Sequence, residues 1–176
     1  MPVLNKELNM FSTSPDAGSG FAMLEVLISV MVLSFGLLGL AGLQAYGLKN
    51  NHSAYLRSLA TQQAYDIADR MRANRQGVAN GKFNLVSGIP TNPGCISSGC
   101  TANNLADYDM FQWNTDNAAL LPSGSGVVCR DSSPNDGATP AAPACDGNGN
   151  LYAVKIWWND EKDPANLTRF VTVVQP

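Results

Sequence analysis

The most apolar part of the chain is the 23-residue run from Phe21 to Leu43, in which Glu25, Ser29 and Ser34 are the polar side chains. At 1.5 Å per residue, a helix of this length is roughly 35 Å long, which is enough to cross the apolar core of a bilayer. A buried core helix and a secretory signal are the two alternatives. Runs this long are rare in soluble domains of this size, and a secretory signal is cut after its apolar region. Here a polar stretch precedes the run, which continues without a break into more helix-forming sequence. We therefore predict a membrane-spanning helix over 21–43 that stays in the mature protein, with any cleavage on its N-terminal side.

From Leu48 onward the apolar positions recur every three or four residues, which predicts an amphipathic helix. These positions are Leu48, His52 or Tyr55, Leu56, Leu59, Gln63 or Ala64, Ile67 and Met71, whereas the opposite face carries Lys49, Asn50, Arg57, Thr61, Asp66, Arg70 and Arg72. No proline occurs between positions 16 and 89, and Gly77 and Gly81 supply stop signals. We expect one helix of about 55 residues, with 21–43 in lipid or a filament core and 44–76 as the spine of a soluble head.

Residues 77–176 contain short apolar runs separated by turn-forming residues, which predicts a β-rich head. The candidate strands are Phe83–Ile89, Met110–Trp113, Gly126–Cys129, Leu151–Trp158 and Arg169–Val174. In the last two strands, the alternating sets that share a face are Tyr152, Val154, Ile156 and Trp158 on one, and Phe170, Thr172 and Val174 on the other. We expect this small antiparallel sheet to pack on the amphipathic part of the helix, which gives an α+β fold. Two long loops, Ser87–Asn104 and Asp131–Asn150, connect these segments.

All four cysteines follow the long helix. Four cysteines allow three pairings, and we favour Cys95–Cys100 with Cys129–Cys145 because each pair would close one long loop. Closing the 15 residues between Cys129 and Cys145 stabilises a fold by about 3 kcal/mol in the chain-entropy model. Zinc and free thiols are the alternatives, but there is no C-x-x-C motif, and the chain has a single histidine. Disulfides form in oxidising compartments, so they indicate a periplasmic or external head.

Glu25 is an acid inside the predicted membrane segment, where a carboxylate costs about 3 kcal/mol or more unless it is paired. A cut between Gly20 and Phe21 would place a new α-amino group one helical turn from Glu25, on the same face. That amine can pair with Glu25 of its own chain or of a neighbouring subunit. The alternative is a protonated or snorkelling glutamate near the interface.

Composition and charge narrow the functional classes further. The formal net charge is −3, and residues 81–176 carry five basic and nine acidic side chains, which disfavours nucleic acid as a partner. The chain has no G-x-S-x-G, P-loop or H-E-x-x-H motif, and its one histidine makes triad chemistry improbable, so we expect no enzyme and no catalytic residue. The turn containing Asp146, Asn148 and Asn150 begins like a calcium loop, but Leu151 stands where an EF-hand needs glycine. We therefore expect no cofactor and no metal, and a solvated turn at Asn159, Asp160, Glu161 and Asp163.

The segment Gly20-Phe21-Ala22-Met23-Leu24-Glu25-Val26-Leu27 resembles the prepilin cleavage and methylation motif of type IV pilins and type II secretion pseudopilins. Residues 50–58 and 65–75, together with 126–129 and 152–158, are similar to minor pilins of the PilV type, the type IV pilus modification proteins. The resemblance implies that a prepilin peptidase removes leader residues 1–20 and methylates the Phe21 amine. It also implies that Glu25 guides the docking of subunits into a filament.

The resemblance thus implies a minor subunit of a type IV pilus that helps to prime assembly or sits at the tip, together with other minor and major pilins. The subunit would cross the inner membrane once, with its head in the periplasm, and then enter the pilus. A minor pseudopilin of type II secretion is the nearest alternative. From a different class, the loops Ser87–Asn104 and Asp131–Asn150 would form a pilus-tip module for adhesion or DNA uptake.

Overall fold

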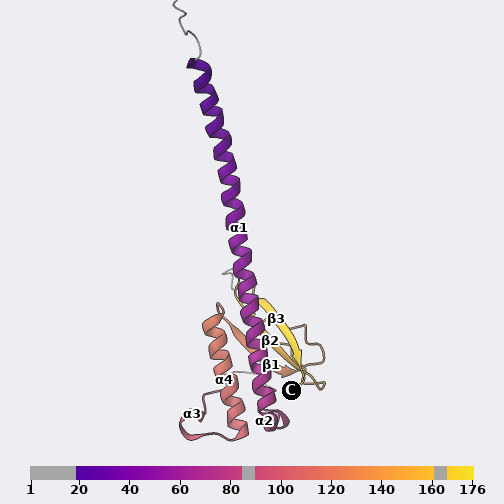
Figure 1. The fold of residues 1–176 in the computed structure, drawn as a ribbon. Coiled ribbons are helices and arrows are strands. Elements are labelled where there is room, and N and C mark those ends of the chain that lie inside the picture. Colours follow the sequence, from indigo (N-terminus) through magenta and orange to yellow (C-terminus); the bar gives the residue numbers. More distant parts are fainter. Residues whose placement is uncertain (1–18, 85–89, 161–165) are drawn as a thin grey trace, which may run out of the picture. The chain divides into compact units, whose positions relative to one another are not determined.

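The computed structural model describes residues 19–84, 90–160 and 166–176, which fall into two compact units that meet between Leu48 and Lys49. Helix α1 (Ser19–Ala73) begins in the first unit and ends in the second (Figure 1). The second unit then contains, in order, α2 (Arg75–Ala79), α3 (Cys95–Ser98), α4 (Ala102–Leu120), β1 (Ser125–Arg130), β2 (Tyr152–Trp158) and β3 (Thr168–Val174). The prediction of an α+β fold with a long N-terminal helix and a small antiparallel sheet is confirmed.

The first unit consists of the apolar part of α1, and its side chains from Phe21 to Tyr46 are all exposed. Ser29 donates its hydroxyl to the main-chain oxygen of Glu25 at 2.7 Å, and Ser34 donates to Val30 at 2.6 Å. These bonds to the preceding turn satisfy the two hydroxyls within the helix itself. The apolar face of this segment is therefore available to lipid or to other helices.

The second unit uses one face of α1 as part of its core. The buried residues of α1 recur at helical spacing, namely Leu56, Ala60, Ala64, Ile67, Ala68 and Met71. Most predicted core positions are confirmed, whereas Leu48 and Tyr55 are exposed. The helix ends at Ala73 because Asn74 caps the next one, accepting a hydrogen bond from the Gly77 amide at 3.0 Å.

The sheet has the order β1-β2-β3, and both pairs of strands are antiparallel. The three predicted strands near these positions are confirmed, with ends shifted by a residue or so. One face of β2 joins the core shared with α1, through Tyr152, Val154, Ile156 and Trp158. Their partners across the strand pair include Val174, Thr172 and Phe170, as the two-residue period predicts.

One predicted strand is wrong. Met110–Trp113 lies inside α4, where the buried residues Ala106, Met110, Trp113 and Asn117 follow helical spacing. A short apolar run does not distinguish a strand from a buried helix, and Thr101 starts the helix by accepting a hydrogen bond from the Asn104 amide at 3.3 Å. Phe83 lies in a turn with its side chain fully buried, and residues 85–89 of the other predicted strand lie outside the described part of the chain.

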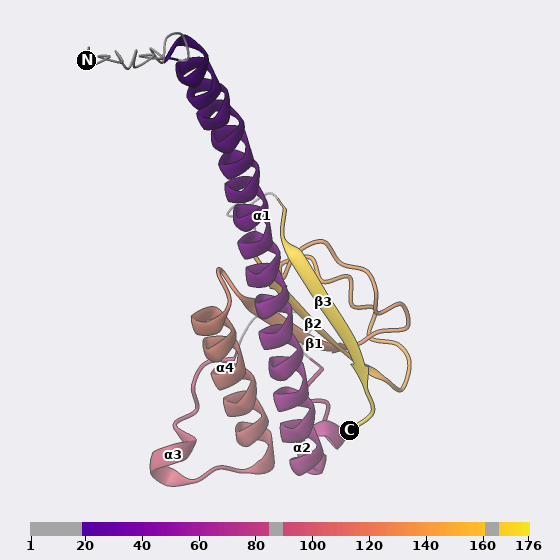
Figure 2. The same cartoon turned by 45° about the horizontal axis from the view of Figure 1, so that its top comes forward.

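The two predicted loops differ in their structure. The first, Ser87–Asn104, contains α3 and the first turn of α4. The second, Asp131–Asn150, has no helix or strand and one isolated bridge between Thr139 and Ala142. Within the second unit, α4 and this second loop lie on opposite sides of α1 (Figure 2).

Candidate assembly site

The residues predicted to direct processing and assembly lie at the start of α1. Gly20, Phe21 and Glu25 all belong to this helix, and the Phe21 side chain is 83% exposed. Positions 21 and 25 are one turn apart, so their side chains share a face of the helix. Residues 19–48 contain no lysine, arginine or histidine. A positive partner for Glu25 must therefore come from a freed α-amino group or from outside this segment.

Among the described residues, one helix, Phe21–Ala73, is long and apolar enough to cross a membrane by length and composition. Its most apolar window is not buried inside the structure. A core helix of a soluble domain would hide that window, since burying apolar surface is the main force that holds such helices in place. The segment fits membrane anchoring.

Two disulfides staple the loops of the second unit. Cys95 joins Cys100 with their Cα atoms 5.0 Å apart, and Cys129 joins Cys145 with their Cα atoms 6.1 Å apart. These are the pairs that we favoured from loop closure. Candidate ligand atoms of Cys129, Asp131 and Cys145 lie within 4.8 Å of one another. Both sulfurs belong to the disulfide, so the thiolates that a metal would need are absent while the bond is intact.

A buried charge that was not predicted from the sequence lies on the outer face of the sheet. Lys155 in β2 is fully buried, and its Nζ donates to Asp131 Oδ2 at 2.5 Å and to Asp136 Oδ1 at 2.7 Å. It also donates to the main-chain oxygens of Asp136 at 3.2 Å and Pro143 at 2.8 Å. All four acceptors come from the loop between Cys129 and Cys145. A lysine in the middle of the apolar run YAVKIWW was the signal for this site, because a lysine is rarely buried without partners.

Asp136 and Arg169 extend this cluster toward the surface. Hydrogen bonds from Lys155 and, with a smaller effect, from Ser133 hold the pKa of the Asp136 carboxyl below its usual value. The Arg169 guanidinium donates to the main-chain oxygen of Gly137 and, at 3.0 Å, to that of Asn135. Lys155 of β2 and Arg169 of β3 thus hold the same loop. Lys155 binds its carboxylates and main-chain oxygens, and Arg169 binds further main-chain oxygens.

The turn considered as a calcium loop is closed by hydrogen bonds of its own. The Asp146 carboxylate accepts from the hydroxyl of Ser132, from the Ser132 amide at 3.1 Å and from the Asn148 amide at 2.8 Å. These bonds lower the pKa of Asp146 to about 2, and the bond from the Ser132 side chain has the largest effect. Asn150 is exposed just before β2. The carboxylate therefore has a structural use in holding the two ends of the loop together.

A polar cluster joins α1 to α4. Arg70 donates through Nε to Asp66 at 2.8 Å, and through Nη1 to Gln112 at 3.0 Å and to Asp109 at 3.5 Å. Burial raises the pKa of the Asp109 carboxyl, and the nearby Arg70 offsets this in part. The cluster fixes the two helices to each other and contains no nucleophile, so its role is structural.

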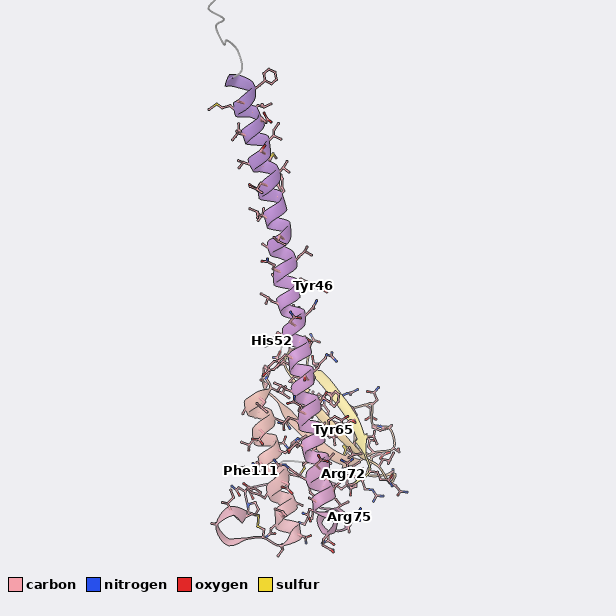
Figure 3. The ribbon with its side chains drawn as sticks, viewed as in Figure 1. Tyr46, His52, Tyr65, Arg72, Arg75 and Phe111 are labelled. Atoms are coloured by element: carbon pink, nitrogen blue, oxygen red, sulfur yellow. A yellow bond between two sulfur atoms is a disulfide. The ribbon has the colours of Figure 1, made fainter. Side chains whose placement is uncertain are left out.

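The remaining residues singled out in the sequence have ordinary surroundings. His52 is exposed on α1 (Figure 3). Trp113, Trp157 and Trp158 are fully buried. Asp160 accepts a hydrogen bond of 2.5 Å from Ser53 of α1, so the predicted acidic turn contacts the helix there. The other acids of that turn, Glu161 and Asp163, lie outside the described residues.

Comparison with known proteins finds a match to one family model. Residues 42–111 match the family model described as Tt1218-like, Type IV pilin Tt1218. No curated protein and no solved structure is significantly similar to the chain. The matched stretch runs from the apolar part of α1 into α4. Together with the fold, the match shows that this part of the chain is similar to type IV pilins.

Proposed function

We propose that this chain is a minor subunit of a type IV pilus, of the PilV type, which helps to prime pilus assembly or sits in the tip complex. The observation that carries the proposal is the start of α1, where the exposed apolar segment 21–46 carries one acid, Glu25, four residues after Phe21. An exposed apolar surface of this size needs lipid or other helices to cover it. In a filament core built from such helices, neighbouring helices would cover this apolar surface and exclude water from it.

Processing would create the partner that Glu25 lacks. A membrane prepilin peptidase would cut after Gly20 and methylate the new amine of Phe21. In a low-dielectric core, pairing an amine with a carboxylate is far more favourable than leaving either charge alone. An incoming subunit would therefore stop at the axial position where the two charges meet, which sets the register of the filament.

The same proposal gives the location of the chain. Before assembly the subunit would be held in the inner membrane by residues 21–43, with residues 77–176 and their two disulfides in the periplasm, where thiols are oxidised. Residues 44–76 would serve as the spine of the head, and residues 1–20 as the removed leader. Its partners would be other minor and major pilins, the prepilin peptidase and the assembly machinery.

Replacing Glu25 tests the register role against a matched control in the same helix. Glu25→Ala should leave the processed protein in the membrane fraction at normal levels and lower its amount in sheared filaments by roughly tenfold, because the charge pair is lost. Ser29→Ala is the control, since its hydroxyl bonds only to the main-chain oxygen one turn before it. Normal incorporation of Glu25→Ala, or an equal loss in both variants, would contradict the register role.

Two alternatives make different predictions. A type II secretion minor pseudopilin would share the same helix, and a secretion operon around the gene, in place of a pilus operon, would favour it. A DNA-uptake module needs a basic patch, but three cations of the head already face carboxylates, as Arg70 pairs with Asp66, Arg72 with Asp69, and Lys82 with Asp107. Absence of DNA binding by the full chain at low salt would exclude that role. Adhesion through the loops Ser87–Asn104 and Asp131–Asn150 would still require a ligand to be found.

A further inference from the structure

The loop that covers Lys155 contributes few buried side chains of its own. We call residues 131–145 the lid. Between its ends, over 132–144, Pro143 is the one fully buried residue. Burial of apolar surface supplies most of the stability of a folded segment. The lid therefore depends on its polar contacts with Lys155 and Arg169, on the bonds between Ser132 and Asp146 at its base, and on the disulfide that joins its C-terminal end to β1.

The polar contacts alone hold the lid weakly, because Lys155 gains little from them. A buried ion pair roughly balances the cost of removing both charges from water. All four acceptors of the ammonium belong to the lid, so an open lid leaves no acceptor behind in the sheet. The long stem of Lys155 would then carry its charge into water. Opening thus exchanges one set of hydrogen bonds for another.

The disulfide shifts this balance toward the closed lid. Cys129 is fully buried in β1, where it pairs with Ala153 of β2, whereas Cys145 is half-buried at the end of the lid. The bond holds that end against the sheet and removes most of the open conformations of the 15 intervening residues. Without the bond, those conformations become available again, and this end of the lid is held by the hydrogen bonds between Ser132 and Asp146 and by that from the Gly147 amide to Arg130.

We propose that the Cys129–Cys145 bond is a redox-sensitive latch: it keeps the lid closed over Lys155, and its reduction opens the lid while the rest of the head stays folded. In the reduction, a dithiol supplies two electrons and two protons. The S–S bond breaks, two cysteine thiols form, and the dithiol becomes a disulfide. Lys155 would be accessible in a reducing compartment and sealed in an oxidising one. This inference concerns the head alone and does not depend on the proposed role in a pilus.

The accessibility of Lys155 can be measured by amine acylation of the full chain in detergent micelles. The probe is N-hydroxysuccinimidyl acetate, with each lysine quantified by mass spectrometry. Lys82 is the internal reference, because its side chain is 41% exposed. In the oxidised protein Lys155 should react at least roughly tenfold more slowly than Lys82. The variant C129S/C145S should bring the two rates within about threefold of each other.

The second disulfide provides the matched control. C95S/C100S removes the bond around α3 and leaves the lid intact, so Lys155 should stay protected. Dithiothreitol added to the wild type should reproduce the effect of C129S/C145S. Hydrogen exchange of the α4 amides shows whether the head remains folded. Protected Lys155 in C129S/C145S would overturn the proposal. Equal exposure of Lys155 in both double variants, or loss of α4 protection together with that of Lys155, would also overturn it, because the opening would then not be local to this latch.

Discussion

Trp113 of α4 donates its indole N–H to the main-chain oxygen of Gln63 in α1 at 2.8 Å. The ring of the same tryptophan lies against Gly126 at the start of β1, where an added Cβ would overlap its atoms. One buried side chain thus contacts α1, α4 and the sheet. Of the chain's three tryptophans, all fully buried in the head, this one best reports whether the head is assembled.

Gly126→Ala should destabilise the head by about 1–3 kcal/mol, because the methyl group must push the Trp113 ring out of its position. Urea unfolding followed by tryptophan fluorescence measures this loss. Gly47→Ala is the control, since nothing lies within 4 Å of a Cβ at that position. If both variants unfolded at the wild-type urea concentration, the close contact between Gly126 and Trp113 would be refuted.

Asp109→Asn should not destabilise the head at neutral pH, and should stabilise it slightly. Burial raises the pKa of this carboxyl in the folded state above the ordinary value of 3.8. As the pH rises from 3.8 through the raised folded pKa, ionisation of Asp109 therefore lowers the stability of the folded state. The amide removes that penalty, and Arg70 keeps its bonds to Asp66 and Gln112. The gain should vanish below pH 3.8, where Asp109 is protonated in both states. The control Asp66→Asn should lower stability by less than about 1 kcal/mol, as expected for a partly exposed pair. A marked loss in Asp109→Asn at pH 7 would contradict this reasoning.

Asp146→Asn should weaken the closure of the loop at neutral pH. The folded pKa is about 2, against an ordinary value of 3.8, so the stabilisation is complete above pH 3.8 and is lost as the pH falls through about 2. The difference in unfolding midpoint between wild type and variant should therefore shrink steadily across that window. Asp116→Asn, near the C-terminal end of α4, is the comparison variant. A similar pH profile for Asp116→Asn would contradict the assignment of this pH dependence to Asp146.

The long helix and the sheet were predictable because each repeats one simple pattern over many residues. Twenty-three residues that are almost all apolar, followed by apolar positions at steps of three and four, leave few alternatives to a helix. The β2 and β3 strands were recognisable from β-branched and aromatic residues that alternate between faces. Even the side on which Tyr152, Val154 and Ile156 lie followed from the two-residue period.

The errors occurred where tertiary contacts decide the structure. The run at Met110–Trp113 is too short to show its period, and its burial in a helix depends on contacts such as that between Trp113 and Gln63. The site around Lys155 depends on carboxylates 19 and 24 residues earlier in the chain, which no local pattern connects to it. Glu25 was easier to single out, because an acid in an apolar helix is anomalous without any knowledge of its neighbours.

Our central proposal is that the α-amino group freed on Phe21 pairs with the carboxylate of Glu25. N-terminal sequencing combined with intact mass measurement of the protein from membranes and from sheared filaments tests this claim most directly. We expect a single mature species that starts at N-methylated Phe21 in both fractions. A native protein that still begins at Met1, or at any position other than Phe21, would contradict it.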